Sequence, residues 1–290
     1  MPLSVALDRF RDMNLCLGTV QFGMDYGVQG NKRPLLSESL RMLDYAAANG
    51  IDTFDTAAGY AIAEEIIGVW IEKNPGLRNR VKIISKAAPC DLRQSLVRMG
   101  LDFLDGYLLH NPKDIFDDTI VDELVRLKKD GLAKKIGVSV YEHNEALHAI
   151  SKVGLIQLPY NILDRRMQCV FTAAEKSDCT IHARSAFLQG LLLMKPENLP
   201  SFLLAARPIL RDIDALCAAA GLSRKQLAIG YVKQTAGISH LVFGVDNLEQ
   251  LKEFIHIFNQ DCDSAVINEV AKKFENIDED IIMPNRWRKT

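Results

Sequence analysis

The sequence lacks any close grouping of cysteines that would mark a metal site. None of its six cysteines forms a C-x-x-C pair, and no cysteine–histidine cluster has the spacing of a zinc site. Scattered cysteines in a chain of this size are typical of reduced thiols in a cytosolic protein. We therefore expect no bound metal and no disulfide framework. The six are Cys16, Cys90, Cys169, Cys179, Cys217 and Cys262.

Long apolar runs and an excess of one charge are also missing. No segment approaches the ~20 apolar residues of a membrane span, and residues 1–13 carry charges where a signal peptide needs an apolar stretch. The net charge is −2 and the pI about 6.3, so we expect no strongly basic surface for nucleic acid or an anionic membrane. These features predict a cytoplasmic protein with neither nucleic acid nor a membrane as its partner.

Linkers, low-complexity tracts and repeats of solenoid period are absent as well. The chain has 290 residues, of which 48% are apolar and 25% charged, the balance of a globular protein. This length is large for one ordinary domain but normal for a single α/β barrel, which takes about 250 residues. We expect one domain over residues 1–290.

Short apolar segments alternate with longer segments of helical spacing. The short ones are rich in Val, Ile, Leu and Phe, as expected for strands buried on both faces. Alternation with short turns favours parallel strands joined by right-handed crossovers. Eight such segments fit a closed (β/α)8 barrel (a TIM barrel), and an open doubly wound sheet is the alternative. The predicted strands are 15–20, 53–54, 81–85, 103–109, 135–138, 155–158, 180–183 and 241–243, and helices are expected at 37–49, 61–73, 92–100, 119–130 and 145–151.

Three positions predict where helices begin or end. Ser37 is a suitable N-cap for the first long helix. Asn49-Gly50 and Asp130-Gly131 are expected to end two helices, because glycine readily takes the left-handed conformation after a helix.

The Rossmann fingerprint G-x-G-x-x-G is absent from the first strand–helix turn, which reads Gly18-Thr19-Val20-Gln21-Phe22-Gly23. A dinucleotide, if one binds, would therefore bind in another way. Residues 185–222 are the least regular part of the chain. They form a long connection after the seventh predicted strand, and long connections in barrels often close over a site.

Ionisable residues follow three consecutive predicted strands. Asp55 ends the second strand and Tyr60 lies five residues later, Lys86 ends the third strand, and His110 ends the fourth. Chemistry in such barrels takes place at the C-terminal ends of the strands, so these residues are expected at one rim. Each alone has a structural explanation: a helix cap for Asp55, solvation for Lys86, turn formation for His110.

Together these four residue types suit protonation of a carbonyl. A tyrosine is a poor acid at neutral pH, and a neighbouring lysine ammonium is expected to lower its pKa. An aspartate keeps that lysine charged and oriented. A histidine can donate a hydrogen bond to a carbonyl oxygen while hydride arrives from a cofactor.

With these residues in place, the sequence resembles the aldo-keto reductase superfamily. Each matching segment is weak alone, but the set follows the family order over nearly the whole chain. The segments are Leu17-Gly18-Thr19, Asp52-Thr53-Phe54-Asp55-Thr56-Ala57 with Gly59-Tyr60, Ser85-Lys86, Asp105-Gly106-Tyr107-Leu108-Leu109-His110, Gly137-Val138-Ser139, Gln157-Leu158-Pro159-Tyr160-Asn161 and Gln189-Gly190-Leu191.

The resemblance implies a (β/α)8 barrel that reduces a carbonyl compound with NADH or NADPH bound across the barrel mouth. It implies a catalytic tetrad in which Tyr60 is the general acid, Lys86 and Asp55 tune it, and His110 orients the substrate. Ser139 and Gln157 would hold the nicotinamide carboxamide, and Thr19 and Asp55 would lie near the nicotinamide and its ribose. Further cofactor positions implied are Arg184, Ser185, Gly244, Asn247 and Gln250.

Three positions depart from the family pattern. Val140 stands where an asparagine is common after Ser139, and Arg184 stands where an aromatic residue usually stacks on the nicotinamide; a guanidinium plane can also stack. Gln250 stands where a basic residue often contacts the 2′-phosphate of NADP, which weakens the case for strict NADPH preference. Asn247 could hold the adenosine phosphate through helix N–H groups or be a plain N-cap.

Loops would form the substrate pocket. Tyr26 in the first loop could form its wall, and Arg165 with Arg166 could meet an anionic substrate such as a phosphorylated sugar carbonyl, or could simply be solvated charges.

Two other functions fit parts of the pattern. A non-catalytic barrel could bind nicotinamide and act as a redox-sensing partner subunit, but it would have less need of Tyr60. An aldolase could use Lys86 in a Schiff base, but a lysine paired with Asp55 stays protonated and is a poor nucleophile. Nothing in the sequence requires an oligomer.

Overall fold

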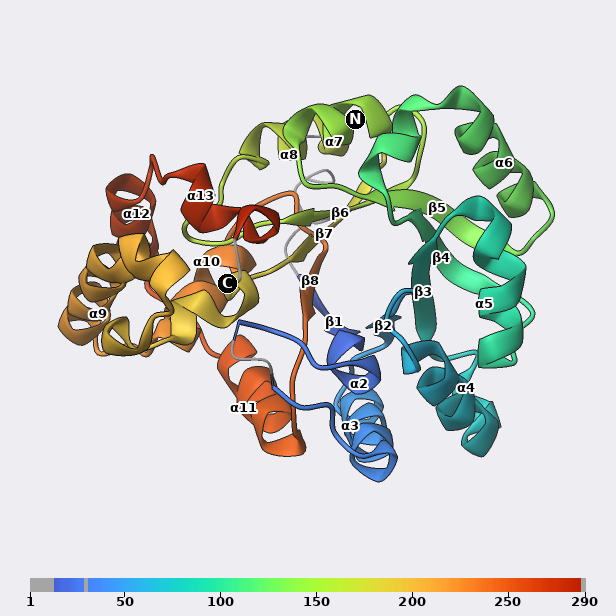
Figure 1. Cartoon of the computed structure of the whole chain (residues 1–290), viewed down its shortest axis with the longest axis horizontal. Helices are drawn as coiled ribbons and strands as arrows, with labels where there is room; N and C mark the ends of the chain where they lie inside the picture. Colours follow the sequence, from blue (N-terminus) through green and yellow to red (C-terminus); the bar gives the residue numbers. More distant parts are fainter. Residues whose placement is uncertain (1–12, 29–30, 288–290) are drawn as a thin grey trace, which may run out of the picture.

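A computed structural model of the chain describes residues 13–28 and 31–287. Eight parallel strands form a closed barrel in sequence order, and β8 closes it by pairing with β1. This confirms the predicted (β/α)8 barrel over the open sheet (Figure 1). The extent of the predicted domain stays a prediction at the N-terminus, because residues 1–12 lie outside the described part. The strands are β1 (Asn14–Gly18), β2 (Thr53–Asp55), β3 (Lys82–Ala87), β4 (Leu104–Leu109), β5 (Ala133–Ser139), β6 (Leu155–Pro159), β7 (Thr180–Arg184) and β8 (His240–Phe243).

Helices surround the barrel on its outside (Figure 1). The α-helices are α2 (Val20–Gly23), α3 (Leu36–Ala48), α4 (Ala63–Lys73), α5 (Leu92–Met99), α6 (Asp118–Lys129), α7 (His143–Ala149), α8 (Gln168–Glu175), α9 (Arg207–Ala220), α10 (Arg224–Lys233), α11 (Leu248–Phe258), α12 (Ser264–Lys273) and α13 (Glu279–Ile282). Short 3-10 turns lie between them: η2 (Pro75–Leu77), η3 (Pro89–Asp91), η4 (Pro112–Phe116), η5 (Leu188–Leu193), η6 (Pro196–Asn198), η7 (Ser201–Ala206) and η8 (Pro284–Arg286).

The core has two parts, as a barrel requires. A small cluster of Ile84, Leu108 and Leu155 joins three strands across the barrel interior. A Cβ at Gly106 would lie 3.1 Å from Ile84 and 3.2 Å from Leu155, so glycine leaves room for these two side chains. The larger cluster fills the layer between strands and helices, where Trp70 is fully buried. This packing fixes the strand ends that carry the site.

The helix ends follow the sequence at two of three predicted positions. Asn49 and Asp130 are the C-cap residues of α3 and α6, and the glycines after them, Gly50 and Gly131, have φ of +85° and +78°. The predicted N-cap at Ser37 is wrong. Helix α3 begins one residue earlier, at Leu36, because the carbonyl of Leu35 accepts the first helical hydrogen bonds.

Strand β1 is shorter than predicted. It ends at Gly18, and Val20 already starts the single-turn helix α2. The predicted strand 15–20 is too long at its C-terminal end, because the apolar Val20 resembles a strand residue although it belongs to α2. The difference matters for the site, because Val20 and Gln21 lie beside the barrel mouth.

The connection after β7 was expected to be irregular and to close over a site. Its first part does line the cavity described below. Its second part is regular, with η6, η7 and the helix α9 of 14 residues. Leu210, Ile213, Leu216 and Cys217 bury one face of α9, a spacing that a reading based on irregular composition overlooked.

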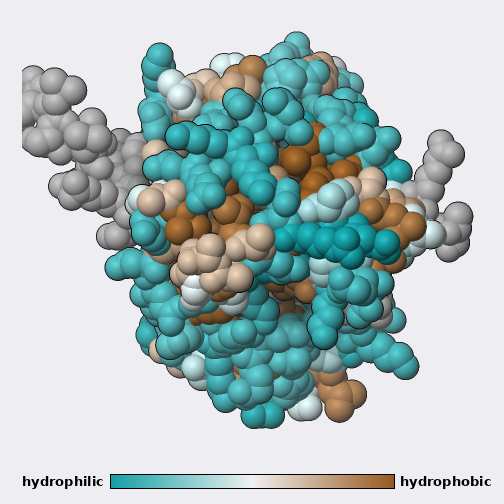
Figure 2. All heavy atoms as spheres, turned by 90° about the vertical axis from the view of Figure 1, so that its left-hand side faces the viewer, coloured by the Kyte–Doolittle hydropathy of each residue, from teal (hydrophilic) through white to brown (hydrophobic). Residues whose placement is uncertain are grey.

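Figure 2 shows the side that carries α9 and α12, where hydrophilic residues dominate and apolar areas are small. Within residues 13–28 and 31–287, no helix combines the length and the apolar character that crossing a membrane demands.

Candidate active site

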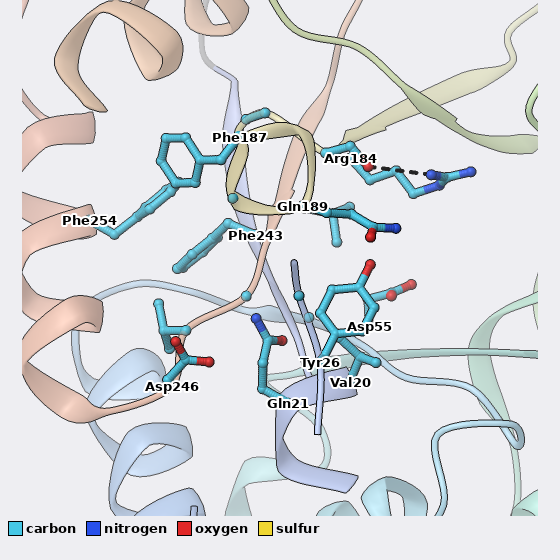
Figure 3. A pocket seen from close by; sticks show the side chains of 18 of the residues that line it. Val20, Gln21, Tyr26, Asp55, Arg184, Phe187, Gln189, Phe243, Asp246 and Phe254 are labelled. Atoms are coloured by element: carbon cyan, nitrogen blue, oxygen red, sulfur yellow. Dashed lines mark hydrogen bonds between the residues drawn. The ribbon is translucent and has the colours of Figure 1, made fainter. Parts of the chain in front are cut away.

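A cavity of about 360 Å³ opens at the C-terminal mouth of the barrel. The ends of several strands contribute to its wall, as expected for a barrel enzyme. Asp55, Ser139, Gln157, Arg184 and Phe243 come from β2, β5, β6, β7 and β8, respectively. Figure 3 shows this pocket from close by. In the described part of the chain, no three metal-binding side chains come together.

Asp55 and Lys86 form a buried ion pair at the base of the cavity. The Lys86 Nζ atom donates to Asp55 Oδ1 at 2.7 Å, to Asp55 Oδ2 at 2.6 Å and to the Thr56 carbonyl at 2.8 Å. Lys86 is 1% exposed, so its charge depends on these acceptors. Burial alone would lower the pKa of Lys86, but Asp55 and Tyr60 raise it above its ordinary value. Lys86 is therefore a permanently charged group at neutral pH.

Two neighbours fix the orientation of Asp55. Gln157 Nε2 donates to Asp55 Oδ1 at 2.8 Å, and Thr19 Oγ1 donates to the Asp55 carbonyl at 3.1 Å. Thr19 is fully buried and is not part of the cavity wall, so it contacts Asp55 on the side away from the cavity.

Tyr60 and His110 lie together above this ion pair. Their rings meet edge to face with centroids 5.8 Å apart, and Lys86 Nζ lies 5.2 Å from the centroid of the Tyr60 ring. The structure therefore brings the four predicted rim residues into one cluster. Both rings line the cavity, whereas Lys86 is buried beneath it.

The electrostatics of Tyr60 differ from the sequence expectation. Burial raises the pKa of Tyr60 above its ordinary value, and the charge of Lys86 only opposes this rise. The expected net lowering is therefore wrong, and Tyr60 is a neutral phenol that keeps its proton. Burial and Lys86 lower the pKa of His110 to about 4, so His110 is neutral at pH 7.

Glycine at position 23 lets the loop that carries Tyr60 reach the mouth. A Cβ at Gly23 would lie 1.7 Å from the Tyr60 carbonyl oxygen, far inside van der Waals contact. The loop backbone is further tied by the Tyr60 N–H, which donates to the Ala57 carbonyl at 3.0 Å. The short helix α2 therefore serves as the support for this loop.

Ser139 and Gln157 lie side by side on the cavity wall. They are paired in register between β5 and β6, and both are almost fully buried. Val140, which departs from the family pattern, contributes only its backbone here: its N–H donates to the Gln157 carbonyl at 2.9 Å.

Arg184 lines the cavity close to the reactive cluster. Its guanidinium stacks over the Tyr141 ring at 4.4 Å from the centroid, and Nη2 donates to the Val140 carbonyl at 2.9 Å. Among the described residues no carboxylate pairs with Arg184. The stacked guanidinium presents a flat cation to the cavity (Figure 3).

The loop after β7 has an unusual backbone. Ser185, Leu188 and Gln189 all have positive φ, at 65°, 48° and 53°, which is costly for residues other than glycine. Val28 from the first loop donates its N–H to the Gln189 carbonyl at 3.2 Å, so the two loops meet over the cavity. Ser185 and Gln189 both line it.

The other end of the cavity is aromatic. The rings of Phe243 and Phe254 are stacked with centroids 3.9 Å apart and an interplanar angle of 10°, and Phe187 meets Phe254 edge to face at 5.8 Å. Figure 3 shows these three rings on one side of the pocket and Asp55 and Arg184 on the other. Gly244 follows Phe243 and contacts the Gln21 side chain, because a Cβ at this position would lie 2.2 Å from Gln21 Oε1.

Several predicted positions fall outside the cavity wall. Asn247 is the N-cap of α11, where its side chain accepts from the Gln250 N–H at 2.9 Å. Arg165 points away, with Nη1 donating to the Ala271 carbonyl of α12 at 2.6 Å. Arg166 pairs with Asp164 at 2.9 Å. The expectation that Arg165 and Arg166 face the substrate is therefore corrected. Arg165 Nη1 and the Arg166 guanidinium donate to protein acceptors away from the cavity, while Arg165 Nε and Nη2 are buried without a partner among the described residues.

Sequence reasoning missed several residues of the cavity wall. Gln21, Asn31, Tyr141, Phe187 and Asp246 were not singled out, and most lie on loops. Of these five residues, only Asp246 could have been found from the sequence. It is a carboxylate two residues after Gly244, the glycine that follows the eighth strand. Tyr26, which was predicted, does line the cavity.

A closed parallel barrel with an acid–base cluster at its C-terminal mouth defines the architecture of a barrel enzyme. The family model described as "Aldo/keto reductase family" matches residues 14–275 of this chain. The protein therefore belongs to the aldo/keto reductase family of oxidoreductases.

Individual relatives agree with this assignment. A glyoxal reductase from Bacillus subtilis is 36% identical over 116 residues, which cover 37% of this chain and 41% of that protein. An NADH-specific methylglyoxal reductase from Escherichia coli is 24% identical, covering 78% of this chain and 85% of that protein. Several curated relatives are matched over only about half their length, from 41% to 52%.

A solved structure shows the same fold. The holo form of the aldo-keto reductase AKR11C1 from Bacillus halodurans superposes with a TM-score of 0.72 at 19% identity, covering 89% of this chain and 91% of that one.

Proposed function

We propose that this protein reduces an aldehyde or ketone to an alcohol with NADH or NADPH, and that Tyr60 donates the proton. The observation that carries the proposal is the placement of a neutral Tyr60 phenol at the cavity, directly over the buried Lys86–Asp55 pair. A redox-sensing subunit would have no use for this arrangement.

The cavity residues fit a nicotinamide dinucleotide. Ser139 and Gln157 offer polar groups for a carboxamide beside the reactive cluster, and Arg184 offers a flat cation there. Gln21 Oε1 is buried without a hydrogen-bond partner within the described residues, as expected for an atom that awaits a ligand. The cofactor, once bound, would supply the hydride.

The protein residues would supply the proton and the orientation. A carbonyl oxygen between Tyr60 and His110 would accept hydrogen bonds from the phenol and from the neutral imidazole. As hydride reaches the carbonyl carbon, the oxygen gains negative charge and takes the proton from Tyr60. Lys86 then stabilises the resulting phenolate, because its ammonium is held charged beneath the ring.

Schiff-base chemistry at Lys86 is disfavoured. The Nζ atom already donates to three acceptors and its pKa is raised, so a neutral amine is scarce at neutral pH. We therefore do not carry the aldolase alternative further.

The substrate would be a small carbonyl compound, such as a dicarbonyl or a sugar-type aldehyde. The names of two relatives, a glyoxal reductase and a methylglyoxal reductase, support the first class. Tyr26 and Tyr141 would form the walls around the carbonyl, and Arg184 stacks on the Tyr141 ring at the same cavity.

A carbonyl panel tests the proposal. The purified protein is incubated with NADH or NADPH and with glyoxal, methylglyoxal, an aldose or a simple ketone, and cofactor oxidation is followed by absorbance. We expect carbonyl-dependent oxidation with at least one of these compounds. Cofactor binding without oxidation by any of them would contradict the proposal and favour a non-catalytic role.

A further inference from the structure

We infer that Asp246 makes this site select NADH over NADPH, because its carboxylate occupies the end of the cavity where the adenosine ribose would lie. The inference rests on the proposed function and adds the choice of nucleotide. Asp246 follows β8 and lines the cavity together with Gln250 and Glu253.

The aromatic end of the cavity is the place for the adenosine. The nicotinamide has to lie near Tyr60 and His110, since hydride and proton must reach the same carbonyl. The remainder of a dinucleotide would then extend toward the end of the cavity lined by Phe187, Phe243 and Phe254, where the surroundings are apolar and suit a purine. Asp246 lies three residues after Phe243, on that side of the pocket (Figure 3).

The carboxylate of Asp246 is held in a defined position. Asn31 Nδ2 from the first loop donates to Asp246 Oδ2 at 2.7 Å, and Gln250 Nε2 donates to the same oxygen at 3.4 Å. Gln250 Oε1 accepts the Asp246 N–H at 2.9 Å. Gln250 thus uses its side chain to support Asp246. The Oδ1 atom of Asp246 accepts no hydrogen bond from residues 13–28 or 31–287 and is free to accept one from a ligand.

The charge balance at this end disfavours a phosphate. The ionisable side chains that line it are Asp246, Glu253 and Lys225. Lys225 Nζ lies 2.5 Å from Glu253 Oε2, so the one cation there within the described residues is already paired. A 2′-phosphate with about two negative charges would meet the unpaired carboxylate of Asp246.

A ribose hydroxyl, by contrast, would find acceptors. It could donate to Asp246 Oδ1, and Gln21 Oε1 is a buried acceptor without a partner among the described residues. Gln21 reaches this place because Gly244 has no side chain. A buried acceptor gains more from a hydroxyl donor than from a phosphate, which offers only acceptors near neutral pH.

Equilibrium binding to the full chain, measured by isothermal titration calorimetry, tests the inference. We expect NADH to bind at least about tenfold more tightly than NADPH. The fragments 5′-AMP and 2′,5′-ADP, which carry only the adenosine end, should show the same preference for the form without the 2′-phosphate. In Asp246→Asn, which keeps the shape and removes the charge, we expect the NADH/NADPH ratio to fall to within about threefold, mainly through tighter NADPH binding.

The matched control is Glu249→Gln. Glu249 lies three residues after Asp246, in the first turn of α11 and outside the cavity wall, where it pairs with Lys252. This variant should keep the preference of the natural sequence, which separates a local effect of Asp246 from a general change in charge.

The outcomes distinguish the inference from the function on which it rests. Equal binding of NADH and NADPH, or an unchanged ratio in Asp246→Asn, would overturn the inference and leave carbonyl reduction standing. Failure of both nucleotides to bind would overturn the proposed function and the inference together.

Discussion

At the residue scale, the site depends on one charge that the interior would otherwise exclude. An isolated ammonium in a buried position costs several kcal/mol. Lys86 stays charged because Asp55 and the Thr56 carbonyl accept all three of its hydrogen bonds. The proton donor lies on the loop after β2 and the charge that would stabilise its phenolate lies on β3, and the barrel geometry holds them close together.

Neutral histidines form the second feature at this scale. His110 at the cavity is one. His182, in the middle of β7, and His240, which begins β8, are two more. Their ring centroids lie 4.2 Å apart, and His182 Nδ1 is buried without a partner in the described part of the chain. Burial and His240 lower the pKa of His182 well below its ordinary value, and burial and Lys82 lower the pKa of His240 to about 4.

This histidine pair predicts a loss of stability in mild acid. The unfolded chain protonates each imidazole near pH 6.5, whereas the folded chain keeps both neutral. The free energy of unfolding should therefore fall as the pH drops below about 6.5, by up to about 1.4 kcal/mol per pH unit for each histidine. Urea unfolding between pH 7.5 and 5.5 measures this slope.

A variant assigns the slope to the pair. His182→Leu should make the slope shallower by about one proton's contribution, while the exposed His143→Ala should leave it unchanged. An identical slope in His182→Leu would contradict the contribution of this pair to acid stability.

At the element scale, the single-turn helix α2 positions the Tyr60 loop. Sequence reading assigned part of α2 to a strand, because Val20 continues the apolar run of β1 and a four-residue helix has too short a pattern to be recognised. The strands and the helices of the first half of the chain were predicted because burial on both faces, or on one face, sets their periodicity. The longest helix, α9, was overlooked inside a segment taken as irregular. The loop between β7 and α9 was not predicted, since its positive φ values at Ser185, Leu188 and Gln189 are imposed by contacts rather than by residue type.

Gly23→Ala tests the role of α2. The added Cβ would overlap the Tyr60 carbonyl, so the loop must move. We expect a loss of stability of about 1–3 kcal/mol and a loss of kcat of about tenfold or more, because displacements near 1 Å cost up to about a hundredfold. Urea unfolding and carbonyl-dependent cofactor oxidation measure the two effects.

Gly76→Ala is the matched control, since a Cβ there meets nothing within 4 Å and Gly76 lies in η2, outside the cavity wall. It should change neither quantity. An unaffected kcat in Gly23→Ala would mean that the position of Tyr60 does not depend on this contact.

At the scale of the whole molecule, the barrel brings together residues that are remote in sequence. The rule that parallel strands end at one rim was enough to predict that Asp55, Lys86 and His110 would meet. Contacts between loops could not be predicted in this way. Asn31 reaches Asp246 across 215 positions, and Arg184 stacks on Tyr141. Both depend on how the first loop and the loop after β7 fold over the mouth, which no periodicity encodes.

The most direct measurement for the account is the rate of carbonyl reduction by Tyr60→Phe with the cofactor saturating. The variant keeps the ring above Lys86 and removes only the proton donor. We predict that kcat falls by about 10² to 10⁴, while the dissociation constant for the nicotinamide cofactor stays within about threefold of the original. Turnover close to that of the natural sequence would contradict the assignment of Tyr60 as the acid.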